Sequence, residues 1–313
     1  MSAVFHAIGV FFDHLSNVGF EALGLALVCQ FVKLCCVSTA WRNIVAASYP
    51  EARVRWRSVF GAMLARVGVN AVVPARGGDA AGLVILKHRL GGSSYATLAS
   101  TLVALTLFDS LVAFCLLVFA ITSGELPSHS ILGRLPGFDF NWLFAHLHEA
   151  LIALGLFLLV ALLLLLWYAE QLFGLRRRIA RGFAIFSDRR RYLRRVAVWQ
   201  VGDWTLRLAT IFFFLRAFHI PATLHNAVLV QVTQSLAVLL PISPSGIGTE
   251  QALLLYSFSG KASRTALLSF SVGMRVTLSL FNACLGFGAI LVMLRTLRWR
   301  QHVEADPDVL AGR

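Results

Sequence analysis

The chain has 313 residues, of which 58% are hydrophobic and 14% are charged. An ordinary soluble domain is about 45–50% apolar and about 25% charged, so this composition is typical of a membrane protein. The net charge is +13, but Lys and Arg lie in short stretches beside apolar segments, which indicates topology determinants and argues against a nucleic-acid partner. We expect a single integral membrane domain over 1–313, without an appended catalytic domain.

Apolar stretches predict the membrane-spanning helices, because crossing about 30 Å of hydrocarbon takes about 20 helical residues. Stretches of that length lie near 20–39, 95–122, 149–169, 196–218 and 266–294. Two shorter stretches, 58–73 and 224–240, carry polar side chains and run into turns rich in Pro and Gly. The sequence therefore predicts an all-α polytopic protein in which these two shorter helices do not span.

Charge in the loops predicts the orientation. The segment 174–195 is rich in arginine, whereas 123–149 carries Arg134 against three acidic residues. Lys and Arg in short loops favour the cytoplasmic side, so we expect 174–195 inside, 123–149 outside and the C-terminus cytoplasmic in a plasma membrane. The basic segment also attracts anionic lipid, and it is where a cytosolic partner would bind. A homo-oligomer is equally compatible with the sequence.

The two shorter helices belong to segments with unusual turns. Both flanks of 58–73 are basic, which a re-entrant hairpin over 58–90 satisfies and a single crossing does not. By the same reasoning, 224–260 forms a second re-entrant hairpin that enters from the opposite face. Each turn contains a proline, two glycines and then a carboxylate, in the order PARGGD at 74–79 and PSGIGTE at 244–250.

Interrupted segments in corresponding positions are typical of an inverted-topology repeat, whose binding site lies near the bilayer midplane. The sequence therefore predicts inverted halves at 20–122 and 196–294, with 149–169 as an accessory span.

Residues in the two turns are candidates for binding. Gly77 and Gly78 permit positive φ and expose backbone donors, and Arg76 offers a guanidinium suited to phosphate. Asp79 either holds that guanidinium or begins the next helix. The alternative is an ordinary interfacial loop whose Arg reaches towards water. Recurrence of the pattern in the second turn favours the binding interpretation, and the candidates there are Ser245, Gly246, Gly248 and Glu250.

Ionisable residues inside the predicted spans are expensive, at about 2.5–3.5 kcal/mol each on insertion scales. Asp203 and Arg207 are four residues apart, which is typical of a self-satisfied ion pair on one helix. Asp109 and Arg275 lie deeper, in matching spans, and either line a cavity or form a structural pair. Lys33, near a predicted helix end, and Arg66, in a short helix, are weaker candidates.

Enzyme motifs are absent from the sequence: GxSxG, HExxH and GxxxxGK do not occur. We therefore expect no catalysis, no metal and no cofactor. Two alternatives stay open beside transport through the predicted midplane site. One is an intramembrane enzyme that acts on a lipid head group, and the other is a non-transporting membrane partner that regulates a lipid-modifying enzyme through 174–195.

Four features together resemble the flippase-like membrane domain of the lysylphosphatidylglycerol synthases and its stand-alone relatives. They are NAVVPARGGD at 70–79, the LFD that ends at Asp109, PISPSGIGTE at 241–250, and Arg275. The resemblance covers about residues 20–295 and implies transport of a lipid between leaflets, with the lipid head group as partner. The substrate-binding residues that the resemblance and the turns suggest are Asn70, Pro74, Arg76, Gly77, Gly78, Asp79, Asp109, Ser245, Gly246, Gly248, Glu250 and Arg275.

The chain departs from the family pattern next to the first turn. The usual motif has Glu where Asp79 stands, and often another Arg where this chain has Ala80, Ala81 and Gly82. Lysyl transfer is not expected here, because in the synthases a cytosolic domain performs it. Stand-alone relatives are associated with aminoacylated phospholipids, polyprenyl-linked sugars and hopanoid-related lipids, so the resemblance implies a class of transport and not one lipid.

Overall fold

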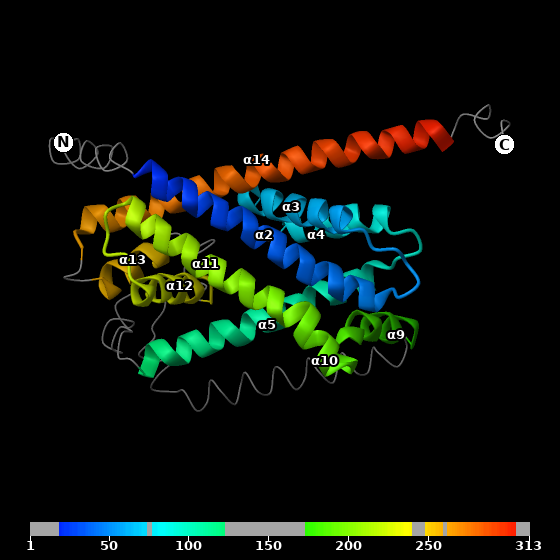
Figure 1. Ribbon diagram of the computed structural model, residues 1–313, viewed down its shortest axis with the longest axis horizontal. Coiled ribbons are helices and arrows are strands. Elements are labelled where there is room, and N and C mark those ends of the chain that lie inside the picture. The colour runs from blue at the N-terminus through cyan, green and yellow to red at the C-terminus, as the bar shows by residue number, and fades with distance from the viewer. Residues whose placement is uncertain (1–18, 74–76, 123–172, 240–247, 259–261, 305–313) are drawn as a thin grey trace.

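The computed structural model describes residues 19–73, 77–122, 173–239, 248–258 and 262–304, and every element within these ranges is a helix (Figure 1). The prediction of an all-α protein is confirmed for this part of the chain. The longer helices are α2 (Phe20–Ser48), α3 (Trp56–Val72), α4 (Gly77–Arg89), α5 (Tyr95–Thr122), α9 (Phe173–Gly182), α11 (Val198–Ala217), α12 (Leu224–Leu239), α13 (Thr249–Ser257) and α14 (Arg264–Glu304). The short helices η1 (Ala184–Ser187), α10 (Arg189–Tyr192) and η2 (Leu193–Ala197) connect α9 to α11.

Three of the described helices are long and apolar enough to cross a membrane, namely α2, the Tyr95–Leu116 part of α5 and the Arg264–Met293 part of α14. The helix α11 is not among them, since Gln200, Asp203 and Arg207 interrupt its apolar run. The predicted span 149–169 lies outside the described residues. The two stretches predicted to be short form α3 and α12, with 17 and 16 residues.

The helices α2 and α11 pack along each other in antiparallel directions. At one end the backbone N–H of Gly19 donates to the carbonyl of Ala217 at 2.9 Å. At the other end the Asn43 side-chain amide donates to the carbonyl of Arg195 at 2.6 Å. Both helices run diagonally across the molecule (Figure 1), and each has one buried face, with Ala26, Gln30 and Leu34 buried on α2 and Asp203, Thr210 and Phe214 buried on α11.

The helices α3 and α4 form an antiparallel pair, and α3 packs against α14. A Cβ atom on Gly68 of α3 would be 2.5 Å from the Cα of Gly286 on α14, so only glycines allow this approach of the two backbones. Small residues at such a contact are typical of membrane helices, which associate through close packing and interhelical hydrogen bonds. The side chains of Gln30 on α2 and Asn282 on α14 make one such bond at 3.0 Å.

Two apolar clusters form the interior. The first contains Phe214, Leu254, Phe258 and Phe270, and it joins the beginning of α2 to the end of α11 and to α12, α13 and α14. The second contains Trp41, Ile44, Met63, Leu86 and Leu98, and it joins the end of α2 to α3, α4 and the beginning of α5. The middle of α2 lies between the two clusters.

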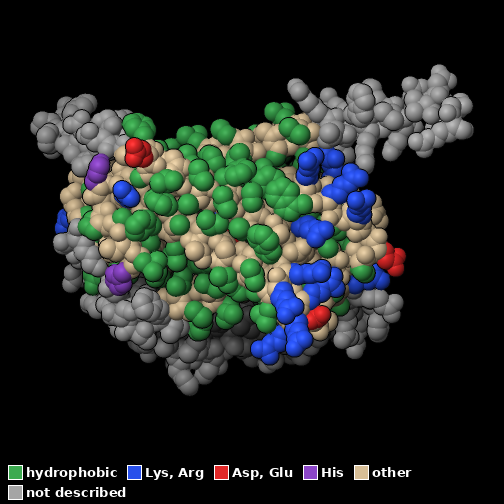
Figure 2. Space-filling view, viewed as in Figure 1, with side chains coloured by type: hydrophobic (Ala, Val, Ile, Leu, Met, Phe, Trp, Pro, Cys, Tyr) green, Lys and Arg blue, Asp and Glu red, His purple; other side chains and the backbone are tan. Residues whose placement is uncertain are grey.

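The outer surface combines a hydrophobic area with a basic end. Figure 2 shows hydrophobic side chains over the middle of one face, with Lys and Arg gathered at one end. The exposed apolar residues include Val28, Phe31 and Val32 on α2 and Val198, Trp199 and Val201 on α11. A surface of this kind suits contact with hydrocarbon and not with water.

Candidate functional site

A cavity of about 530 Å³ with a charged lining lies where α2, α3, α5, α11, α12, α13 and α14 converge. Its charged lining residues are Lys33, Arg66, Asp109, Asp203, Arg207, Glu250 and Arg275. A second pocket of about 730 Å³ adjoins it and shares Arg66, Asn70, Thr106, Asp109, Arg207 and Gln234 with it. We call the two pockets together the central cavity. Charges of both signs at this depth are costly, and such residues in membrane proteins usually mark a binding site or a pathway.

One wall of the central cavity consists of α3 and α4. Arg66 Nε donates to Asp79 Oδ1 at 2.6 Å, and the Asn70 side-chain amide donates to the same oxygen at 3.2 Å. The Asn70 carbonyl oxygen accepts the backbone N–H of Gly78 at 2.8 Å. Arg66 and Asn70 are one helical turn apart, so they present their polar groups to the first turn of α4 on a single face of α3.

The interpretation of Gly77 and Gly78 as a positive-φ turn with free backbone donors is wrong. Both residues begin α4, and positive φ among the described glycines occurs at Gly92 and Gly248. Gly78 is required for packing, since a Cβ atom there would collide with the carbonyl oxygen of Arg66 and with Asn70. Its N–H is already bound to Asn70 and is therefore not available to a ligand.

The opposite wall consists of α12, α13 and α14. Glu250, in the first turn of α13, accepts a hydrogen bond from the Gln234 amide at 3.1 Å and an ion pair from Arg275 Nη1 at 3.3 Å. Gly248 precedes this helix with φ of 90° and donates its N–H to the Gln251 side chain at 2.7 Å. The two walls therefore share a pattern, in which a carboxylate in a first helical turn receives both an amide and a guanidinium.

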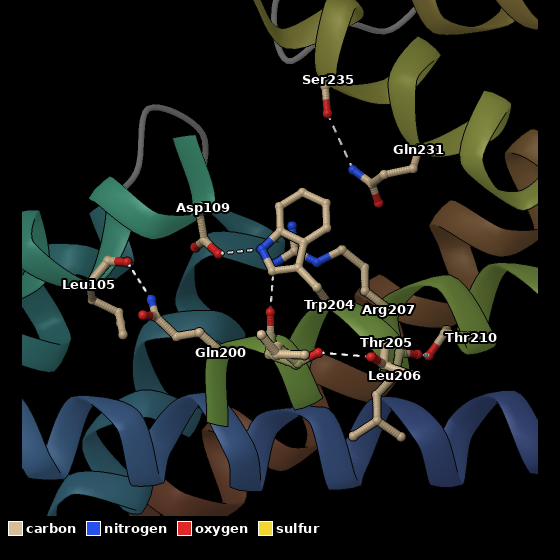
Figure 3. A network of polar contacts seen from close by, with 12 residues as sticks. Leu105, Asp109, Gln200, Trp204, Thr205, Leu206, Arg207, Thr210, Gln231 and Ser235 are labelled. Atoms are coloured by element: carbon tan, nitrogen blue, oxygen red, sulfur yellow. Dashed lines mark hydrogen bonds and ion pairs between the residues drawn. The ribbon is translucent and has the colours of Figure 1, made fainter. Parts of the chain in front are cut away.

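A third wall consists of α5 and α11 (Figure 3). The indole N–H of Trp204 donates to Asp109 at 2.9 Å, and the Arg207 guanidinium lies over the Trp204 ring, 4.4 Å from its centroid. Arg207 Nη2 also donates to Asp203 at 3.1 Å, so the predicted ion pair between these residues is confirmed. The Gln200 amide fastens α11 to α5 through the carbonyl of Leu105 at 2.7 Å.

The structure brings together many of the predicted binding residues. Those that line the central cavity are Asn70, Asp79, Asp109, Glu250 and Arg275. Gly78 is bound to Asn70 through its backbone N–H. Gly248 is exposed at the start of α13. Pro74, Arg76, Ser245 and Gly246 lie outside the described residues, and their role stays a prediction.

Lys33 and Arg66, which are the weaker candidates from the sequence, both line the cavity. Lys33 was expected near a helix end because the apolar stretch ends near 39, but α2 continues to Ser48 and places it in the middle. For Arg66 a signal was present, since its four-residue spacing from Asn70 puts two polar side chains on one face of an otherwise apolar helix.

A charged cavity among helices that are long and apolar enough to cross a membrane defines a polytopic membrane protein. The chain belongs to the family described as the lysylphosphatidylglycerol synthase TM region, whose family model matches residues 5–286. The family resemblance drawn from the sequence is thereby confirmed, and the family is a membrane domain associated with lipid handling. Comparison with curated proteins and with solved structures returned no match.

Proposed function

We propose that this protein moves a lipid between the two leaflets of a plasma membrane by passing its polar head group through the central cavity. The observation that carries the proposal is the cavity itself, with charges of both signs between two apolar clusters. A lipid head group needs a polar path, whereas its tails can stay in the surrounding hydrocarbon. The apolar outer surface of α2, α5 and α14 suits contact with such tails. The lipid leaves chemically unchanged, so the proposed protein is a transporter and not an enzyme.

The two ion pairs of the cavity suggest how a head group is held. The pairs Arg66–Asp79 and Arg275–Glu250 lie on opposite walls, and each couples one helix to the next. A head group with a phosphate or an amine competes with these pairs for hydrogen bonds, so its arrival weakens the contact between the coupled helices. In the proposed mechanism this competition links lipid binding to helix movement on one wall and then on the other.

An inverted repeat would supply the two alternating gates, and the packing of the helices supports it. The contacts α2–α3, α3–α4, α4–α5 and α2–α5 have counterparts in α11–α12, α12–α13, α13–α14 and α11–α14. Likewise, α3 packs on α14 while α12 packs on α5. In our proposal α3–α4 and α12–α13 are the re-entrant hairpins of the two halves, they open to opposite faces, and the C-terminus is cytoplasmic.

Transport is testable in vesicles that contain the purified protein and a trace of tail-labelled fluorescent phosphatidylglycerol or phosphatidylethanolamine. A membrane-impermeant reductant bleaches the outer leaflet, and the later decay reports arrival from the inner leaflet. We expect the wild type to accelerate this decay for at least one probe, and Glu250→Gln to slow it by about tenfold or more, as expected for loss of a charge-assisted contact. Arg216→Gln is the matched control, because Arg216 is exposed on α11 and lies outside the central cavity.

Two results would contradict the proposal. One is a decay for both probes that is no faster than in protein-free vesicles. The other is equal transport by wild type and Glu250→Gln. A loss of function that follows charge reversal in 174–195, with Glu250→Gln unaffected, would instead favour the regulator of a lipid-modifying enzyme.

A further inference from the structure

Each carboxylate of the central cavity accepts at least one hydrogen bond from a protein donor. Asp79 accepts from Arg66 and Asn70, and Asp109 accepts from Trp204. Asp203 accepts from Arg207, and Glu250 accepts from Gln234 and Arg275.

The cations of the cavity are not matched in the same way. Lys33 lines the cavity, and within the described ranges it has charged neighbours in Arg207, Asp203 and Asp109 but makes no hydrogen bond or ion pair. Arg207 gives one N–H to Asp203, while its buried Nε has no hydrogen-bond partner among the described residues. The unmatched donors in the cavity thus belong to two cationic side chains, which an anion would match.

Lys33 and Arg207 lie on neighbouring helices that both line the cavity. Their helices, α2 and α11, run antiparallel side by side, and Cys36 of α2 lies against Gly202 of α11. Counting back from this contact places Lys33 opposite the turn of α11 that carries Trp204 and Arg207. Stacking on Trp204 fixes the plane of the Arg207 guanidinium, as Figure 3 shows for the two side chains. An ammonium and an oriented guanidinium therefore converge on one part of the cavity.

We propose that Lys33 and Arg207 form a phosphate subsite, so that the lipid handled by this protein carries a phosphate. That the ligand is a lipid rests on the proposed function. That it carries a phosphate rests on the two cationic side chains and not on the proposed function. One phosphate oxygen can accept from the part of the Arg207 guanidinium that lines the cavity while another accepts from the Lys33 ammonium, and charge-assisted bonds of this kind are about twice as strong as neutral ones. A head group without an anionic group leaves both donors unmatched, which disfavours neutral glycolipids and sterol-like lipids.

Binding is measured apart from transport, on protein purified in dodecyl maltoside, a detergent without phosphate. The probes are dioleoylphosphatidylglycerol, dioleoylglycerol with the same tails and no phosphate, and inorganic phosphate as competitor. We expect the wild type to bind the phosphate-bearing lipid at least about tenfold more tightly than dioleoylglycerol. Lys33→Met should remove most of this preference and Lys33→Arg should retain it.

The controls separate the subsite from the fold and from transport. Lys33→Met breaks no hydrogen bond, so its melting temperature should equal or exceed that of the wild type. Lys87→Met, which removes a lysine that stacks on Tyr95 outside the cavity, should keep the lipid preference. An unchanged preference in Lys33→Met, or equal binding of both lipids by the wild type, overturns the subsite. Lys33-dependent binding of inorganic phosphate without binding of phosphatidylglycerol assigns the site to a free anion and overturns the lipid assignment. A Lys33-dependent lipid preference in a protein that moves no lipid in vesicles supports the subsite and overturns the transport proposal alone.

Discussion

Arg66 on α3 and Asp79 in the first turn of α4 form an ion pair of 2.6 Å, the shortest of the described ion pairs of the central cavity. The side chains are 18% and 30% exposed, so the pair is partly screened and removing one partner costs less than the 3–5 kcal/mol of a fully buried pair. We predict that Asp79→Ala lowers the free energy of unfolding by about 1–3 kcal/mol. The measurement is the melting temperature of the purified protein in detergent.

Two variants make this test specific. Asp79→Glu keeps the carboxylate and should lose less stability than Asp79→Ala. Glu51→Ala removes an exposed acidic residue from the connection between α2 and α3 and should leave the melting temperature unchanged. Equal melting temperatures for Asp79→Ala and the wild type would show that the pair does not hold α3 and α4 together.

A second prediction concerns the packing of Gly78. An added methyl group at this position collides with backbone atoms of α3, which cannot rotate away, so Gly78→Ala should destabilise the protein by about 1–3 kcal/mol. Gly24→Ala on α2 is the matched control, because nothing lies within 4 Å of its added methyl group. Since alanine favours helix over glycine, Gly24→Ala should be neutral or stabilising by up to about 1 kcal/mol. Similar unfolding curves for the two variants would argue against the α3–α4 contact.

The sequence predicts the helices well where an apolar run has a clear end. The short stretches 58–73 and 224–240 were expected as helices and match α3 (Trp56–Val72) and α12 (Leu224–Leu239) closely. The first span was predicted to end near 39, but α2 continues to Ser48, because Trp41, Ile44 and Val45 pack into the second apolar cluster. Burial by neighbouring helices thus extends a helix through Arg42 and Asn43, where hydropathy alone ends it.

The residues that line the central cavity were predictable in part from the sequence. Asp109 and Arg275 stand out because each is isolated in a long apolar run, and both line the cavity. The partners that satisfy them, Trp204 and Glu250, come from other helices, and spacing along the chain carries no information on such contacts. The role of Gly78 was misread because glycine serves both positive φ and close approach, and only the position of α3 distinguishes the two.

A third prediction concerns the coupling between Glu250 and Arg275. Their ion pair joins α13 to α14, and Gln234 from α12 binds the same carboxylate. In a double-mutant cycle, Glu250→Gln and Arg275→Gln should each lower stability, and the double variant should lose about 0.5–3 kcal/mol less than the sum of the two. Glu250→Gln combined with Arg216→Gln serves as the reference cycle, because Arg216 is outside the cavity and its effect should be additive. A coupling energy near zero for Glu250 and Arg275 would contradict a functional link between these helices.

The last prediction tests the proposed arrangement of the two helical pairs in the membrane. Single cysteines are introduced into a chain whose five native cysteines have been replaced. Positions 51 and 91 flank α3–α4, and positions 222 and 262 flank α12–α13. If both pairs are re-entrant and inverted, a water-soluble maleimide labels 51 and 91 from one side of the membrane and 222 and 262 from the other. Position 28, on the exposed apolar face of α2, should resist labelling from both sides. Labelling of 51 and 91 from opposite sides would mean that α3–α4 crosses the bilayer, and the two halves would then not be inverted copies of one hairpin design.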